Sequence, residues 1–196
     1  MSPKVPRIPF LPRDEWTPEV RDLFSAMDEP GVKRDGTSSH LTLTMINHPA
    51  LARGFYAFGK QVLLASSLPD RLREIITLYI GWRYQAEYEW SHHVAMAKRV
   101  GVTEEEIEAV KQGAAMPVWS DLERSCLRAT QQLCDRARID DQTWSEMARH
   151  FDKKQLMDFV LTVGHYVMLS LALGAFEVEA EPSVWTKEFR GDRAAQ

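Results

Sequence analysis

The stretch WRYQAEYEWSHH, residues 82–93, joins two segments whose patterns are helical and contains most of the residues that could carry chemistry. An apolar pattern at helical spacing precedes it and predicts a buried helix that begins at Asp70 and ends near Tyr84. A second helix is predicted over residues 87–100, because Gly101 follows it as a natural C-cap. The chain therefore turns between two consecutive helices inside this stretch.

Helical patterns and caps extend over the rest of the chain, and no β-alternation of useful length occurs. Further helices are predicted after Thr17 and over residues 41–46, 50–64, 104–112, 121–136, 142–150 and 153–174. Segments 72–76 and 156–160 also align with each other, each after a cap and before a long apolar helix, as in a duplicated helical unit. The expected fold class is all-α.

The composition is that of a globular protein, and the length suffices for one well-buried core or for two small intertwined repeats. The chain has 196 residues, of which 44% are hydrophobic and 27% charged. Proline recurs at every third position from Pro3 to Pro12, which predicts an extended N-terminal arm over residues 1–16. We expect a single helical domain over residues 17–180 and a C-terminal tail over residues 181–196.

Charge and apolar content exclude several classes of partner. The net charge is −4, and the basic residues are scattered, so the basic face of a nucleic-acid binder is missing. No apolar run approaches the ~20 residues of a membrane helix, and the start does not resemble a secretory leader, so we expect a cytoplasmic protein. Cys126 and Cys134 lie more than two helical turns apart, too far for a disulfide, and are expected to be reduced.

Glu89 and His93 stand one turn apart on the second predicted helix. A carboxylate in this position can fix the tautomer of the imidazole and raise its basicity, which suits proton transfer. A surface Glu/His pair without any function has the same spacing. The spacing of these two residues alone therefore does not establish a site.

A longer spacing, Glu-x11-Ala-x2-Glu-x3-His, connects Glu74, Ala86, Glu89 and His93. It resembles the Glu-x11-Cys-x2-Cys-x3-His motif of alkylhydroperoxidase D-like proteins in the carboxymuconolactone decarboxylase superfamily. Most of the chain from about residue 40 looks like this superfamily, including segments 47–51, 97–106 and 144–179. Ala86 and Glu89 occupy the two cysteine positions, as in a branch that lacks the redox Cys-x-x-Cys.

The missing thiols decide between two chemistries. Peroxide reduction needs a reactive thiolate and a resolving partner, and neither Ala86 nor Glu89 can form a disulfide. The resemblance instead implies a cofactor-free decarboxylase, lyase or isomerase acting on a small carboxylated or lactone-type compound, in the manner of aromatic catabolism. It also implies an alkylhydroperoxidase D-like helical bundle that assembles as a homo-oligomer, a dimer, trimer or hexamer.

In this interpretation Glu74, Glu89 and His93 are the catalytic residues. His93 moves a proton to or from the substrate, Glu89 assists the transfer, and Glu74 orients His93 from the neighbouring helix. The candidate substrate-binding residues are the aromatic and histidine side chains near the motif and in the last long helix: His92, Trp82, Trp90, His165 and Tyr166.

Two other classes of function stay open. Glu89 and His93 are adequate ligands for a divalent metal, although the two well-spaced histidines of hydrolytic zinc helices are missing. A non-catalytic helical assembly protein would form the oligomer without binding a small molecule. No cofactor or metal is expected in the leading interpretation.

Overall fold

The computed structural model describes residues 6–27 and 39–190, and within them all regular structure is helical. The α-helices are α1 Pro18–Met27, α2 His40–Met45, α3 Pro49–Leu64, α4 Asp70–Arg83, α5 Glu87–Arg99, α6 Glu104–Val110, α7 Asp121–Arg136, α8 Asp141–Met147, α9 Lys153–Phe176 and α10 Lys187–Arg190. Short 3-10 turns lie at Arg13–Glu15, Gly113–Ala115 and Pro182–Val184. The predicted all-α class is confirmed.

Local sequence signals explain why these helices begin where they do. Thr103, Ser120 and Asp152 are the N-caps of α6, α7 and α9, and each accepts a hydrogen bond from the backbone N–H three residues later. In each case the side chain at that later position bonds back to the cap, which completes a capping box. The helix starts are therefore determined within four residues of sequence.

Helices α4 and α5 form a tight hairpin at the centre of the molecule. Gln85 turns the chain with a φ of 53°, and the N–H of Ala86 donates to the carbonyl of Gly81 at 2.8 Å. The helices can approach closely because Gly81 has no side chain: an added Cβ would lie 3.2 Å from the backbone nitrogen of Trp90. This close approach brings the inner faces of α4 and α5 together.

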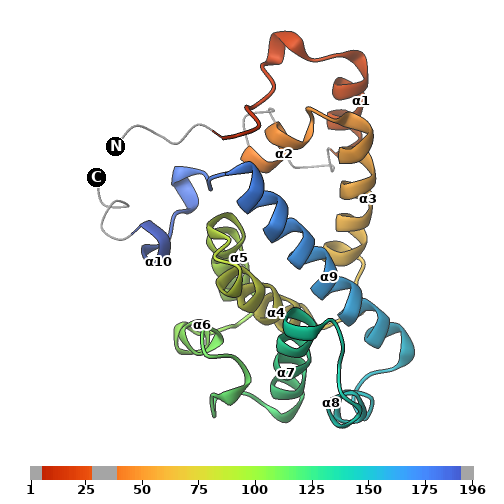
Figure 1. Ribbon diagram of the computed structural model, residues 1–196, viewed down its shortest axis with the longest axis vertical. Helices are drawn as coiled ribbons and strands as arrows, with labels where there is room; N and C mark the ends of the chain where they lie inside the picture. Colours follow the sequence, from red (N-terminus) through yellow and green to blue (C-terminus); the bar gives the residue numbers. More distant parts are fainter. Residues whose placement is uncertain (1–5, 28–38, 191–196) are drawn as a thin grey trace.

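Helix α9 crosses the hairpin and connects the two ends of the molecule (Figure 1). It packs on α4, on α3 and on α7. Helices α1, α2 and α3 gather beside one end, and α6, α7 and α8 lie at the other. The described part of the N-terminal arm contacts the C-terminal end of α9, where the N–H of Arg7 donates to the carbonyl of Phe176 at 2.9 Å.

The apolar content of helix α9 is higher than predicted, since no apolar run of membrane-helix length was expected from the sequence. Among the described residues it is the helix long and apolar enough to cross a membrane by length and composition, with 24 residues and a mean hydropathy of 1.8 over an 18-residue window. Its inner face, however, contains polar groups such as Thr162 and His165, which are buried against neighbouring helices. These features are typical of the central helix of a soluble-like helical fold.

The two cysteines are both free, as expected. Cys126 is buried in α7, and burial raises the pKa of its thiol to about 12. A thiol in this state is a small apolar core group rather than a reactive one.

Candidate functional site

The imidazole of His93 lies between two carboxylates inside the α4–α5 hairpin. Its Nδ1 is 2.6 Å from Oε2 of Glu74 on α4, and its Nε2 is 3.0 Å from Oε1 of Glu89, one turn earlier on α5. All three side chains are buried, with exposed fractions of 8%, 1% and 3% for His93, Glu74 and Glu89. The structure thus brings together the three residues predicted to be catalytic, and we call them the Glu–His–Glu cluster.

The two carboxylates determine the charge of His93. Burial opposes protonation, but the hydrogen bonds and negative charges of Glu74 and Glu89 outweigh it and raise the pKa of His93 to about 9. At neutral pH the ring is therefore an imidazolium that donates one N–H to each carboxylate. No lone pair remains on either nitrogen.

A buried arginine, Arg73, lies beside the cluster. Arg73 is only 6% exposed, and its Nε lies 3.7 Å from Oε1 of Glu74. Its guanidinium also donates to Asp70 at 2.9 Å. Two basic side chains thus face three carboxylates: Arg73 contacts Glu74 and Asp70, and His93 contacts Glu74 and Glu89.

One carboxylate oxygen of the cluster is unpaired. Oε2 of Glu89 is buried and has no hydrogen-bond partner, whereas Oε1 is held by His93. Oε1 of Glu74 also lacks a hydrogen bond, but the Arg73 guanidinium lies beside it. Glu89 Oε2 is thus the cluster atom with free lone pairs and no neighbouring cation.

Helix α9 provides the wall opposite the cluster. The ring of Tyr166 lies edge-on to His93, with 5.2 Å between ring centroids, and edge-on to His165 at 5.3 Å. Burial and the charges of Glu89 and Glu74 raise the pKa of Tyr166, so its hydroxyl stays neutral. Of the five predicted substrate-binding residues, His165 and Tyr166 are the two that the structure places beside the cluster.

The two predicted tryptophans belong to a different contact. Trp82 and Trp90 pack on each other at 5.4 Å and on Phe189 of α10, and the ammonium of Lys111 lies 5.0 Å from the Trp82 ring. Their ring contacts are thus with each other, with Phe189 and with Lys111, and none is with a residue of the cluster. Their contacts hold the C-terminal tail.

His92 also contacts the tail rather than the cluster. Its Nε2 lies 2.6 Å from Oε2 of Glu181, and its ring packs on Tyr88 at 4.4 Å. Oε1 of Glu181 in turn accepts the backbone N–H of His40 at 2.6 Å. These contacts join α5, α2 and the tail, and they place His92 beside Glu181 rather than beside the cluster.

The arrangement of the cluster does not fit a metal. Glu74 and Glu89 bind opposite nitrogens of the same ring, so their oxygens do not converge with an imidazole nitrogen on a common point. Within the part of the chain that the structure describes, no group of three or more histidine, cysteine, aspartate or glutamate side chains is arranged to hold a metal ion.

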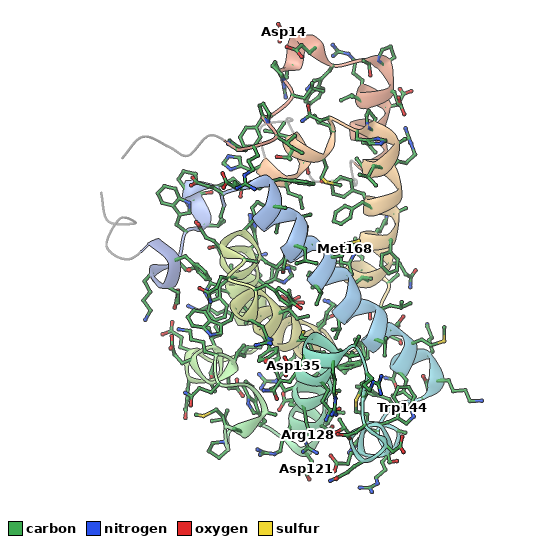
Figure 2. All side chains as sticks on the ribbon, in the orientation of Figure 1. Asp14, Asp121, Arg128, Asp135, Trp144 and Met168 are labelled. Atoms are coloured by element: carbon green, nitrogen blue, oxygen red, sulfur yellow. The ribbon has the colours of Figure 1, made fainter. Side chains whose placement is uncertain are left out.

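Two cavities lie elsewhere in the molecule. One of about 310 Å³ is lined by α7 and α8, including Asp121 at the start of α7 and Arg128 further along it, both labelled in Figure 2. The other, of about 230 Å³, lies over the α4–α5 turn and the end of α9, beside Ala86 and Tyr88. Neither is lined by a residue of the Glu–His–Glu cluster.

Sequence reasoning did not predict three neighbours of the site. Arg73 carries a signal, because a charged residue beside Glu74 within an apolar helical pattern must be paired when buried. Phe55 and Phe58, which pack on His165, carry none. Aromatic residues at helical spacing predict a core face, and nothing local indicates which distant helix they meet.

The fold and cluster define a class: all-helical, alkylhydroperoxidase D-like proteins without the thiol pair. A peroxidase-related protein from Ralstonia eutropha JMP134, described as an alkylhydroperoxidase AhpD core, matches with a TM-score of 0.77, 15% identity and 97% coverage of both chains. A peroxidase-related protein from Silicibacter sp. TM1040 matches with a TM-score of 0.77 and 15% identity, over 94% of this chain and 96% of that chain.

A third structure is the debrominase Bmp8 in complex with 2,3,4-tribromopyrrole, with a TM-score of 0.70, 20% identity and coverage of 89% of this chain and 91% of that chain. No curated protein sequence matches. Residues 49–132, which include the whole cluster, match the model of the carboxymuconolactone decarboxylase family. Over these residues the chain is similar to the carboxymuconolactone decarboxylase family, and its fold is alkylhydroperoxidase D-like.

Proposed function

We propose that this chain is a cofactor-free acid–base enzyme, a decarboxylase, lyase or isomerase, in which Glu89 is the group that exchanges a proton with the substrate. The observation that carries the proposal is the unpaired Oε2 of Glu89 inside a buried ionic cluster. A carboxylate removed from water and oriented by a partner is a competent general base.

This assignment revises the roles that the sequence favoured. His93 was expected to move the proton, but both of its nitrogens are engaged and its raised pKa keeps it charged at neutral pH. An imidazolium without a lone pair cannot act as a base. His93 instead fixes the position of Glu89 and stabilises its negative charge, and Glu74 holds His93 from the other side.

The charge balance favours an uncharged substrate. Each positive group in the region already faces a carboxylate, and Glu89 presents a further negative oxygen to any ligand. A substrate carboxylate at this position would be repelled and would lack a cation. Among the two expected substrate types, a lactone therefore fits the cluster better than a carboxylate placed next to Glu89.

The comparisons support a chemistry other than peroxide reduction. The debrominase among the similar structures binds a small planar heterocycle, so this fold accommodates such molecules in at least one relative. Ala86 and Glu89 replace the thiols of the motif, so any activity of this chain must differ from thiol chemistry. We place the enzyme in the cytoplasm and expect a homo-oligomer.

A helical assembly protein is the second candidate, and one observation favours it. The two described cavities do not reach the cluster, and a closed Glu–His–Glu cluster can simply be a buried ionic network. The same network would then determine how α4 and α5 pack. The two candidates differ in whether a small molecule binds to the cluster.

The test is a thermal-shift screen of lactones and aromatic-ring-cleavage products, followed by turnover assays on each stabilising compound. Glu89→Gln should lower kcat/KM of a verified substrate by about 100-fold or more, the usual contribution of a general base. The control is Glu105→Gln, an exposed carboxylate on α6, which should leave kcat/KM unchanged. Full activity of Glu89→Gln would exclude Glu89 as the base.

A further inference from the structure

His165 is a buried histidine whose ring is fixed by apolar neighbours. The ring stacks on Phe55 at 5.2 Å between centroids, and Phe58 lies edge-on at 5.4 Å. Phe58 is 36% exposed, so it separates His165 from solvent. Such surroundings suit a phenylalanine or leucine, and nothing in the packing explains an imidazole at this position.

The backbone of α3 also approaches this ring. A Cβ added to Gly59 would lie 3.4 Å from Cε1 and 3.5 Å from Nε2 of His165, which is van der Waals contact, so the backbone of α3 lies close beside the imidazole. The ring is therefore held from α3 by two aromatic side chains and a glycine. These contacts restrict the orientation of the ring.

The Nδ1 atom of His165 has no hydrogen-bond partner. The residue is only 6% exposed, so water does not replace the missing partner at the surface. A buried polar atom of this kind destabilises a fold, and in native proteins it commonly indicates a bond formed with something else. Nδ1 of His165 is such an atom, and the ring that carries it lies edge-on to Tyr166 at 5.3 Å between centroids.

The charged groups that act on His165 belong to the cluster. The charge of Glu89 favours protonation, the charge of His93 opposes it, and burial outweighs both, so the pKa of His165 lies below its ordinary value. His165 is thus a neutral imidazole at pH 7, while His93 is an imidazolium. The two histidines have opposite protonation states on the two sides of Tyr166.

We propose that His165 is a second catalytic residue, whose Nδ1–H donates a hydrogen bond to the substrate oxygen on which negative charge develops when Glu89 removes a proton. This inference rests on the proposed function of Glu89. The substrate class is an uncharged carbon acid with a carbonyl group, such as a lactone. Phe55 and Tyr166 provide apolar contacts on either side of His165.

The proton balance closes without a further reactant. Oε2 of Glu89 takes a proton from the carbon beside the carbonyl, and the electron pair of that C–H bond delocalises to the carbonyl oxygen. The hydrogen bond from His165 stabilises this enolate. The proton then returns from Glu89 to a different carbon, so a double bond moves and no oxidant, reductant or water is consumed.

The probe is α-angelica lactone, an uncharged β,γ-unsaturated lactone whose isomerisation to the conjugated form requires this proton shift. Imidazole ¹⁵N spectra of the full-length protein would be recorded during titration with the lactone. We expect the His165 signals to move on binding, in the wild type and in Glu89→Gln alike. Unchanged His165 signals at saturating lactone would overturn the inference.

Two variants distinguish the effect of the His165 nitrogen from the effect of its aromatic ring. His165→Phe retains the aromatic stacking but removes the nitrogen, and His165→Asn places an amide near the position of Nδ1. We expect His165→Phe to lower kcat for lactone isomerisation at least tenfold while its melting temperature rises, because an unpaired polar atom is lost. His165→Asn should recover part of kcat, which a purely structural role would not predict.

The failures of the two proposals are distinguishable. If the wild type binds the lactone at His165 but neither isomerises it nor exchanges its α-proton in D₂O, the role of Glu89 fails and the contact with His165 stands. If isomerisation depends on Glu89 but is unaffected in both His165 variants, the His165 inference is wrong and the proposed function stands.

Discussion

At the scale of single residues, His93 connects the stability of the hairpin to pH. Its pKa is raised from 6.5 to about 9 because Glu74 and Glu89 favour the imidazolium. A raised pKa contributes stability that is fully present below the unfolded value of 6.5 and is lost as the pH rises through 9. Above that pH, a neutral ring presents a lone pair to one of two carboxylates.

We therefore predict that the free energy of unfolding falls by about 3 kcal/mol between pH 6.5 and pH 9.5, the equivalent of this pKa shift. Urea denaturation at several pH values measures it. The decrease should persist in His150→Gln, an exposed histidine, and disappear in His93→Gln. A wild-type stability that is constant over this range would show that His93 is not held as an imidazolium.

The cluster could be predicted from the sequence, but its chemistry could not. Helical periodicity places Glu89 and His93 on one stripe, and the motif that the chain resembles implies that Glu74 joins them. Which oxygen stays free depends on distances of a few tenths of an ångström, which spacing does not determine. His165 was named as a candidate, but its contacts with Phe55 join segments about a hundred positions apart and leave no local pattern.

At the scale of secondary structure, the α4–α5 hairpin depends on Gly81. An added Cβ would lie 3.2 Å from the nitrogen and 3.5 Å from the Cα of Trp90, both backbone atoms of α5. Backbone cannot rotate away as a side chain can, so α5 must shift by a few tenths of an ångström. Glu89 and His93 are on α5 and would move away from Glu74.

We predict that Gly81→Ala destabilises the protein by about 1 kcal/mol, since overpacking of about 1–3 kcal/mol exceeds the gain of up to about 1 kcal/mol from helix propensity. The pKa of His93, followed by NMR, should fall towards 6.5 in the same variant. The control is Gly54→Ala on α3, where an added Cβ meets nothing within 4 Å. That change should stabilise the protein, and a similar gain in Gly81→Ala would contradict the argument.

Helix boundaries were predictable to within a few residues because their signals are local. Asp152, Ser120 and Thr103 begin helices through bonds to residues three positions later. The contacts of the tail after Glu181 could not be predicted from the sequence. The tail's contacts with His92, Trp82 and Trp90 join segments far apart in the sequence, so no local pattern indicates them, and the sequence alone favours substrate binding for these three residues.

At the scale of the whole molecule, α9 has a second apolar face that the monomer leaves uncovered. Met157, Leu161, Met168 and Leu171 are 65%, 48%, 47% and 57% exposed, and Figure 2 places Met168 on α9. With Gly164 they follow the alternating four- and three-residue spacing of a helix that packs on another helix. The inner face of the same helix carries His165 and Tyr166.

We predict that this outer face of α9 packs against a second copy of the chain. A stable interface buries about 1,200–2,000 Å² in total, which an apolar helix about 36 Å long and its neighbours on α3 can supply. Light scattering should then give a mass that is a multiple of 22.5 kDa for the wild type. Leu171→Glu places a charge at the interface and should shift the protein to monomer.

The matched control is Ser145→Glu, which adds the same charge to an exposed position of α8 and should leave the mass unchanged.

If the oligomer forms through α9, the second copy also covers the neighbourhood of Phe58, the partly exposed ring over His165. Leu171→Glu should then weaken lactone binding along with assembly. A wild type that is monomeric at tens of micromolar would contradict the prediction and would leave the apolar face of α9 for a different partner.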